Sequence, residues 1–349
     1  MGLLFTARTF RLSRRGQLTD RYSNATAQLA SEKQTERLAG IYALEHVMAE
    51  SARDHGAVVD ILAAFIRERR PLVDTGGDRI PEDSDGSDKA YKSAKAERFP
   101  ADVQAALTVL GRRPRRPEQH GVDLRNSDLA GADLSRSYFP NLAVEFTVLS
   151  GADLSGAELT GLVANNAVLR DANLRNARLA NAQLREVVGH GAALDGARLG
   201  AADFRNSGFI EISAEGADLR GAVMDYAVFD DSNMGKCDMR EASLISTKLR
   251  HVNLSHARLT NANLSAAQIQ QSNLLGADVR NADFDRVGME GAVFYSILPE
   301  EEVAKNLTRT QVLQSFRDQT TILPPEPKNL PPGLRRAKSA KRFPGRPNS

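Results

Sequence analysis

A five-residue period governs the middle of this 349-residue chain. Every fifth residue from Leu124 to Phe294 falls on one register, and 32 of these 35 residues are large and apolar. The residue two positions earlier is small, and it is Ala in 20 of the 35 units. This period fits neither regular element, because it advances about 500° around an α-helix and changes face at each step of a strand. A chain that turns by about 90° per unit would instead form stacked four-sided coils, ~4.8 Å apart, with both positions inside.

The exceptions to the period follow the same packing logic. At three units the large position is small, and the small position two residues earlier is large instead. A close-packed interior requires such an exchange of volume. The exchanged pairs are Leu162 with Ala164, Val187 with Gly189 and Ile212 with Ala214. We expect the large positions to form the core, represented by Leu124, Leu154, Leu174, Phe204, Phe229, Leu254 and Phe284.

The unit reads Ala-Asx-Leu-x-Gly/Asn, as in residues 151–155 and 261–265. Over residues 121–298 this pattern resembles the pentapeptide-repeat family, without an insertion or deletion. The resemblance implies a mainly β fold, a right-handed quadrilateral β-helix of about 8–9 coils.

Residues 17–120 are predicted to be a helical region, interrupted by a flexible loop at 71–98 that is rich in Gly, Asp and Ser. The region resembles the helical N-terminal part of actinobacterial pentapeptide-repeat proteins, and we expect it to cap the first coil. Helical spacing of apolar residues indicates helices at 35–50, 58–66 and 101–110, with a weaker one at 17–30.

Three further segments complete the predicted organisation. Residues 1–16 mix apolar and basic side chains, residues 299–325 resemble a C-terminal cap with a helix, and residues 326–349 form a disordered, basic, Pro-rich tail. No apolar run is long enough for a membrane span, and one cysteine, Cys237, excludes an intramolecular disulfide framework. We therefore expect a cytoplasmic protein, with peripheral attachment to the inner face of the membrane through residues 1–16 as the alternative.

No group of residues in the sequence indicates catalysis. The six His residues are scattered, and none has an acidic partner at a spacing that defines an acid–base site. His251 and His256 lack a third and fourth metal ligand. Cys237 falls on the small inward position, where a buried thiol is inert. We expect no metal, no cofactor, no small-molecule substrate and no direct contact with nucleic acid.

Two sets of outward positions are candidates for binding. One is apolar where water is expected, which indicates a surface that faces a partner or is covered by the chain's own helices or a second copy. The other is acidic and lies among Lys236 and Arg240. The apolar set is Val148, Val163, Val168, Val188, Val223 and Val228, and the acidic set is Asp225, Asp230, Asp231, Asp238 and Glu241.

The first functional hypothesis is a non-catalytic scaffold that presents the sides of its β-helix to an unidentified protein partner, and a homodimer is compatible with it. The alternative comes from the resemblance, because some family members imitate duplex DNA, bind DNA gyrase and confer resistance to topoisomerase poisons. Such mimicry requires a run of negative potential. Residues 121–298 carry 16 basic and 22 acidic residues, a net charge of only −6. A membrane-associated scaffold is the third hypothesis.

Overall fold

The computed structural model describes residues 17–72 and 98–294. Contacts divide the chain into two compact units, Met1–Gln183 (unit 1) and Leu184–Ser349 (unit 2). The predicted segments 1–16, 299–325 and 326–349 lie outside the described residues, as does most of the predicted loop.

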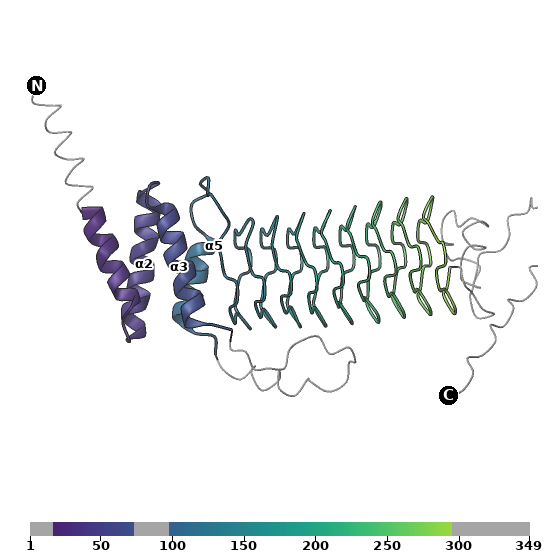
Figure 1. Cartoon of the computed structure of the whole chain (residues 1–349), viewed down its shortest axis with the longest axis horizontal. Coiled ribbons are helices and arrows are strands. Elements are labelled where there is room, and N and C mark those ends of the chain that lie inside the picture. Colours follow the sequence, from purple (N-terminus) through teal and green to yellow (C-terminus); the bar gives the residue numbers. More distant parts are fainter. Residues whose placement is uncertain (1–16, 73–97, 295–349) are drawn as a thin grey trace, which may run out of the picture. The chain divides into compact units, whose positions relative to one another are not determined.

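Four helices precede the coils in the described part of unit 1 (Figure 1). They are residues 17–29, α2 (Gln34–Glu50), α3 (His55–Arg69) and α5 (Ala101–Gly111). The last three pack against one another, and their fully buried side chains include Ile41, Leu44, Leu62, Ile66 and Leu107. The predicted helical N-terminal region is therefore confirmed.

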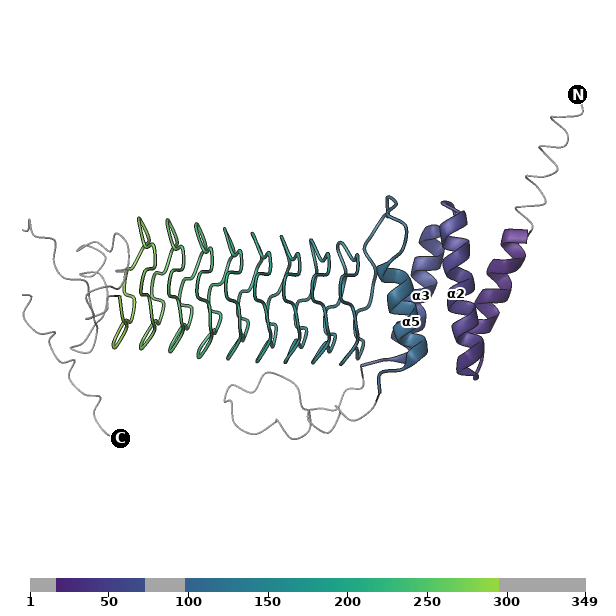
Figure 2. The same ribbon diagram turned by 180° about the vertical axis from the view of Figure 1, so that it is seen from behind.

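The repeats of both units form four-sided coils of 20 residues. Within each unit, the central residue of a side forms a parallel bridge to the residue 20 positions later, as Asp133 does to Asp153 in unit 1 and Asp218 to Asp238 in unit 2. Interstrand hydrogen bonds accompany the bridges, such as the 2.7 Å bond from the Leu154 N–H to the Asn173 carbonyl. Figure 2 shows these coils from behind.

The predicted core lies inside the coils. Each of the representative large residues is at most 1% exposed, because its side chain points inward from the middle of a pentapeptide. The small residues two positions earlier point inward as well, and Ala152, Ala172 and Ala217 are fully buried. The five-residue register read from the sequence is confirmed at these positions.

The corners explain the residue that ends each unit. The backbone there has positive φ, at 10 Gly residues and 24 other residues within the described coils. A left-handed conformation is easiest for Gly and Asn, which accounts for the Gly/Asn at the end of the repeat unit. Most corners are closed by a hydrogen bond from an N–H to the carbonyl three residues earlier, as in Ala152 to Leu149 at 3.0 Å.

A ring from the next coil contributes to one of the volume exchanges. Val187 is buried beside Gly189 as predicted, but a Cβ on Gly189 would lie only 2.3 Å from the Phe209 ring. Phe209 also packs against Phe204 and Phe229, at ring-centroid distances of 5.4 and 5.8 Å. The space at Gly189 is thus filled from two directions.

Buried hydroxyl groups close corners that lack their own hydrogen bond, a feature that the sequence reasoning missed. The Ile212 N–H donates to Ser232 Oγ at 3.1 Å, and Ser232 Oγ donates to the Phe209 carbonyl at 3.2 Å. The hydroxyl therefore bridges the two backbone groups that would pair with each other in an ordinary corner. The same arrangement recurs at Ser207 and Ser272.

The helical region caps all four sides of the first coil in unit 1. Arg67 donates to the Asp123 carbonyl on one side, and the Asp128 N–H donates to the Arg70 carbonyl on the next, at 2.9 Å. On the third side, the Gln104 side chain donates to the Asp133 carbonyl and accepts from the Asp133 N–H. On the fourth side, the Gly111 carbonyl accepts a hydrogen bond from the Tyr138 N–H. These contacts satisfy backbone groups that an open coil would expose.

The capping contacts reach into the segment that was predicted to be loop. Pro71 forms an antiparallel bridge with Ser127, and the Leu72 N–H donates to the Asn126 carbonyl at 2.9 Å. These two residues are therefore fixed by pairing with the first coil.

Candidate interaction surface

The first apolar patch consists of Val148, Val163, Val168 and Phe146 in unit 1. Val148 and Val168 are bridged on one side of the coil, and Val163 is bridged to Ala143 on the neighbouring side. Phe146 lies at the corner between these two sides and is 53% exposed. The valines are half-buried, so the structure places them on the outer surface, as predicted, and brings them together around an exposed ring.

The backbone at Phe146 is unfavourable for its side chain. Its φ is 57°, and a left-handed conformation costs an L-residue roughly 1–2 kcal/mol. Within the described residues, only Phe146 and Tyr226 combine positive φ with a phenyl or phenol ring. A bulky side chain held in such a conformation is a pointer to function.

Leu72 extends this patch. It is 39% exposed and is hydrogen-bonded to Asn126, which occupies the same corner as Phe146 one coil earlier. The Asn126 N–H in turn donates to the Glu145 carbonyl at 3.1 Å, which fixes the two corners against each other. Exposed apolar side chains therefore lie at two successive corners: Leu72 is bound to the corner at Asn126, and Phe146 forms the next corner.

The second apolar patch consists of Val188, Val223, Val228 and Tyr226 in unit 2. Val188 and Val228 are each bridged to Gly208, which lies between them on one side of the coil. Val223 lies on the neighbouring side, between Asp203 and Ser243 in its own ladder. Tyr226 is at the corner between the two sides and is 61% exposed.

The predicted acidic set is largely engaged within the protein. Asp230 is 6% exposed and accepts from the N–H and the guanidinium of Arg250, and Asp225 accepts from Ser243 Oγ at 2.6 Å and the Ile245 N–H at 3.0 Å. Asp238 forms ion pairs with Arg240 at 2.7 Å and Arg258 at 3.6 Å. Among the described residues, Asp231 and Glu241 have no ion pair within 4 Å. The five carboxylates therefore do not form an uncompensated negative surface.

A recurring Asp-x-Arg fork accounts for this compensation. In each fork Arg Nε and Nη2 bind the two carboxylate oxygens of the Asp two residues earlier, while that Asp also accepts the Arg backbone N–H. Burial alone would raise the pKa of Asp203, but hydrogen bonds from Arg205 and Arg185 outweigh it and lower this pKa to about 2. The forks are Asp123 with Arg125, Asp203 with Arg205, Asp218 with Arg220, Asp238 with Arg240 and Asp278 with Arg280.

Cys237 is fully buried at a small inward position, as predicted. Its Sγ donates to the Ala214 carbonyl at 2.9 Å, and burial raises the pKa of the thiol to about 12. A thiol with this pKa is protonated at neutral pH, so it is a poor nucleophile.

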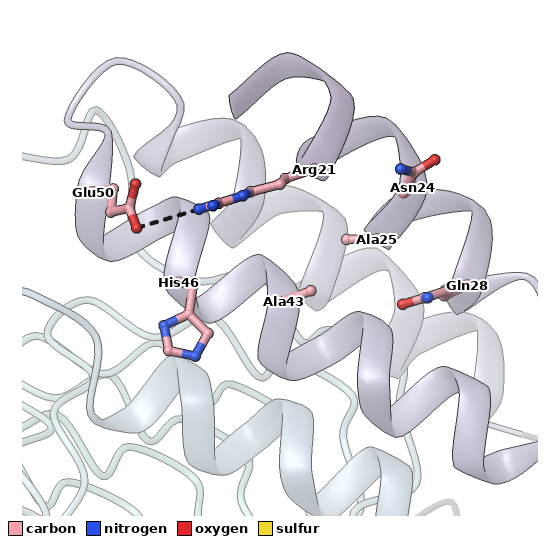
Figure 3. A pocket seen from close by; sticks show the side chains of 7 residues that line it. All are labelled: Arg21, Asn24, Ala25, Gln28, Ala43, His46 and Glu50. Carbon is pink, nitrogen blue, oxygen red and sulfur yellow. Dashed lines mark ion pairs between the residues drawn. The ribbon is translucent and has the colours of Figure 1, made fainter. Parts of the chain in front are cut away.

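A shallow groove lies between helix 17–29 and α2 (Figure 3). Figure 3 shows Arg21 extending across it toward Glu50, with 3.6 Å between Nη1 and Oε1. His46 lies beside this pair, but among these described lining residues no acid, base and nucleophile lie within hydrogen-bond distance of one another. The remaining lining residues are Asn24, Ala25, Gln28 and Ala43.

Within residues 17–72 and 98–294, no group of three or more His, Cys, Asp or Glu side chains is arranged to hold a metal ion. None of the helices in these ranges is both long and apolar enough to cross a lipid bilayer.

The repeats match the family described as Pentapeptide repeats, in eight copies. The chain belongs to the pentapeptide-repeat family. The matched residues are 120–161, 167–206, 209–240, 222–261, 237–274 and 262–296.

Several solved structures resemble parts of the chain. HetL, from the cyanobacterium Nostoc sp. and involved in heterocyst differentiation regulation, is 26% identical, with 53% of this chain and 90% of HetL covered and a TM-score of 0.33. QnrB1, a plasmid-mediated fluoroquinolone resistance protein, is 19% identical, with 49% and 92% covered and a TM-score of 0.36. Rfr23, from the cyanobacterium Cyanothece, is 15% identical, with 41% and 91% covered and a TM-score of 0.31. No curated protein sequence is significantly similar to this chain.

The sequence reasoning found the valines but missed the two rings that complete the patches. The available signal was the corner position, which is usually Gly, Asn or another polar residue. Phe146 and Tyr226 depart from that composition, and the departure becomes meaningful once the position is known to have positive φ.

Proposed function

We propose that the protein is a non-catalytic interaction scaffold and that its first apolar patch binds a protein partner. The observation that carries this proposal is the exposed ring of Phe146, held at positive φ and flanked by the half-buried Val148, Val163 and Val168. An exposed aromatic ring on a strained backbone costs free energy, and burial of that ring by a partner would offset the cost. Aromatic anchors surrounded by aliphatic side chains are also the usual centre of a protein–protein interface.

The capped first coil supports the same proposal. The patch lies on the coils that begin at residues 141 and 161, shortly after the coil that the helices close on all four sides. A binding face on a pre-formed, hydrogen-bonded solenoid loses little conformational freedom on association. This arrangement supports binding through rigidly held surface side chains, and it does not suggest a catalytic reaction. A reducing compartment such as the cytoplasm fits the free, buried thiol of Cys237.

Gyrase binding by DNA mimicry is less well supported by the geometry. The imitation of duplex DNA requires exposed negative charge along the coils. Asp230 and Asp238 are instead bound by Arg250 and Arg240, and Asp225 is bound by backbone and hydroxyl donors. The acidic set thus serves mainly to hold successive coils together.

Affinity capture with two matched variants tests the scaffold proposal. Phe146→Lys changes the patch, and Asn176→Lys places the same side chain at another exposed corner with the same φ of 57°. We expect a specific partner to be retained by the native chain and by Asn176→Lys, and to be lost with Phe146→Lys. Equal capture by all three proteins would show that the first apolar patch is not the binding face.

A further inference from the structure

Four arginine side chains gather on one side of the coils of unit 1. One lies at the centre of this side, two lie at the corner before it, and one reaches it from the segment that follows α5. All four are exposed. We call this surface the arginine patch, and it consists of Arg178 at the centre, Arg136 and Arg175 at the corner, and Arg115 from the segment after α5.

Arg115 is held in place by an aromatic ring. Its Cζ atom lies 4.5 Å from the ring centroid of Tyr138, which is the central residue of this side in the first coil. Stacking on the ring orients the guanidinium plane and leaves the N–H groups at its edge available to a ligand. Among the described residues, the Arg115 side chain takes part in no ion pair or hydrogen bond. Its charge is therefore positioned but not neutralised.

Arg136 lies across the corner of the next coil. A Cβ on Gly156 would lie 3.6 Å from Arg136 Cγ, so the missing side chain at Gly156 leaves room for the arginine stem. The stem therefore extends toward the coils that carry the other two arginines of the side. No ion pair or hydrogen bond within residues 17–72 and 98–294 neutralises the Arg136 side chain. It is thus the second uncompensated charge of the arginine patch.

The arginine patch has an excess of positive charge. Glu158, in the middle of the side, pairs with Arg178 at 3.3 Å, whereas Arg175 donates to the neutral Asn173 at 3.4 Å. The described residues of this side and its corner therefore carry four arginines against one carboxylate, a net charge of +3. By contrast, residues 121–183 as a whole carry 5 basic and 7 acidic residues. The positive charge of these coils is thus concentrated on one side, which favours an anionic ligand.

The surroundings of the patch favour a short acidic segment of a protein over nucleic acid. The guanidinium groups of Arg115 and Arg113 lie 4.5 and 5.6 Å from the centroid of the Tyr138 ring, so this ring is not a free platform for a base. Asp133 and Asp153 are bridged on the neighbouring side, beyond the corner that bears two of the arginines. Their charge would repel a polyanion that is wider than one side of the coil.

The length of the patch also fits a peptide. Arg136 belongs to the first coil and Arg178 to the third, so two coil spacings, about 10 Å, separate them. An extended chain covers this distance in about three residues. The planar carboxylates of its Asp or Glu side chains are the groups that guanidinium groups bind through paired hydrogen bonds. A short acidic run can therefore reach both ends of the patch.

We propose that the arginine patch binds a carboxylate-rich segment of a protein. Phe146 follows Arg136 by 10 residues, half of a 20-residue coil, so the first apolar patch and the arginine patch lie at diagonally opposite corners. Both surfaces can be occupied at once, and the chain can then join two proteins. Binding of the acidic segment does not depend on the scaffold proposal, because the variants that test it leave Phe146 and the valines unchanged.

Fluorescence anisotropy of labelled octaglutamate with the full chain tests the proposal. We expect saturable binding that weakens as the ionic strength rises. Arg115→Glu and Arg136→Glu should each raise Kd by at least about tenfold. Arg286→Glu makes the same change of net charge at an exposed arginine of unit 2, and it should change Kd by less than about twofold. Circular dichroism of each variant separates a lost ligand from a lost fold.

Two further measurements make the test specific. Labelled oligothymidylate of the same charge should bind more weakly than octaglutamate at equal ionic strength. Phe146→Asn should bind octaglutamate with the Kd of the native chain, because the two surfaces are separate. The proposal would be overturned by a lack of saturable octaglutamate binding, by tighter binding of oligothymidylate, or by an equal rise of Kd in Arg286→Glu.

Discussion

In the helical region, Arg37 on α2 donates a 2.6 Å hydrogen bond from Nε to Oδ2 of Asp102 on α5, and both side chains are almost completely buried. Arg37 also donates to the Ser31 and Glu32 carbonyls, at 2.9 and 2.7 Å. Burial acts to raise the pKa of Asp102, but the hydrogen bond and the charge of Arg37 lower it further than burial raises it. The pair therefore stays ionised and joins the second helix to the one that leads into the first coil.

Replacement of Arg37 by Ala should lower the free energy of unfolding by about 3 kcal/mol or more, because it leaves a buried carboxylate with only Arg69, at 3.5 Å, as a cationic neighbour. Urea denaturation followed by circular dichroism measures this. Lys33→Ala is the control, since Lys33 pairs with Glu36 on the surface, and it should change stability by less than about 1 kcal/mol. Similar losses in both variants would contradict the role given to the buried pair.

Ser232→Ala should destabilise unit 2 by about 1–3 kcal/mol. The substitution removes the hydroxyl that joins the Ile212 N–H to the Phe209 carbonyl and leaves both backbone groups buried without that partner. Ser155→Ala, at a partly exposed corner, is the matched control and should be nearly neutral. If thermal unfolding shows no difference between the two variants, the corner at 209–212 does not depend on the hydroxyl.

The period of five was sufficient to predict the coil, the core and the outward direction of the valines, because each follows from which residues repeat on one register. Ser232 and Phe146 show what it could not predict. A Ser at a small inward position looks like any other small residue until the corner in the coil before it is seen to lack its own hydrogen bond. Phe146 could not be recognised as exposed and strained without the φ of its corner. The Asp-x-Arg pairs likewise could not be recognised from the sequence, because a count of charged residues does not show that each Asp is bound by the Arg two residues later.

Asp203 should make stability depend on pH at the acidic end. Its pKa is about 2 in the folded protein, where Arg205 and Arg185 bind it, against about 3.9 for an unfolded Asp. The group therefore contributes stability that is fully present above pH ~4 and is lost as the pH falls toward 2. Urea unfolding at pH 7, 4 and 3 should show a steeper acidic loss for the native chain than for Asp203→Asn. Asp231→Asn, at an exposed corner, should follow the native chain, and an unchanged slope in Asp203→Asn would refute the assignment.

Leu174→Asp should unfold several coils of unit 1, whereas Arg175→Ala should alter stability by less than about 0.5 kcal/mol. Leu174 is 1% exposed, so the substitution places a carboxylate in an apolar interior. Arg175 is the next residue, but it is exposed and contacts Asn173. Limited proteolysis and circular dichroism distinguish the two cases. Equal tolerance would mean that the five-residue register is wrong at this coil.

Phe146→Asn should separate stability from binding. Asn adopts positive φ more readily than Phe and is frequent at the corners of these coils, so relief of the backbone conformation should raise the free energy of unfolding by up to about 1 kcal/mol. The same change removes the ring that anchors the proposed partner, so capture of that partner should be lost. Urea denaturation and capture measured on one preparation give both readouts, with Asn176→Lys as the reference for an inert corner. A loss of stability of about 1 kcal/mol or more would show instead that the Phe146 ring is held by its own valines and belongs to the fold.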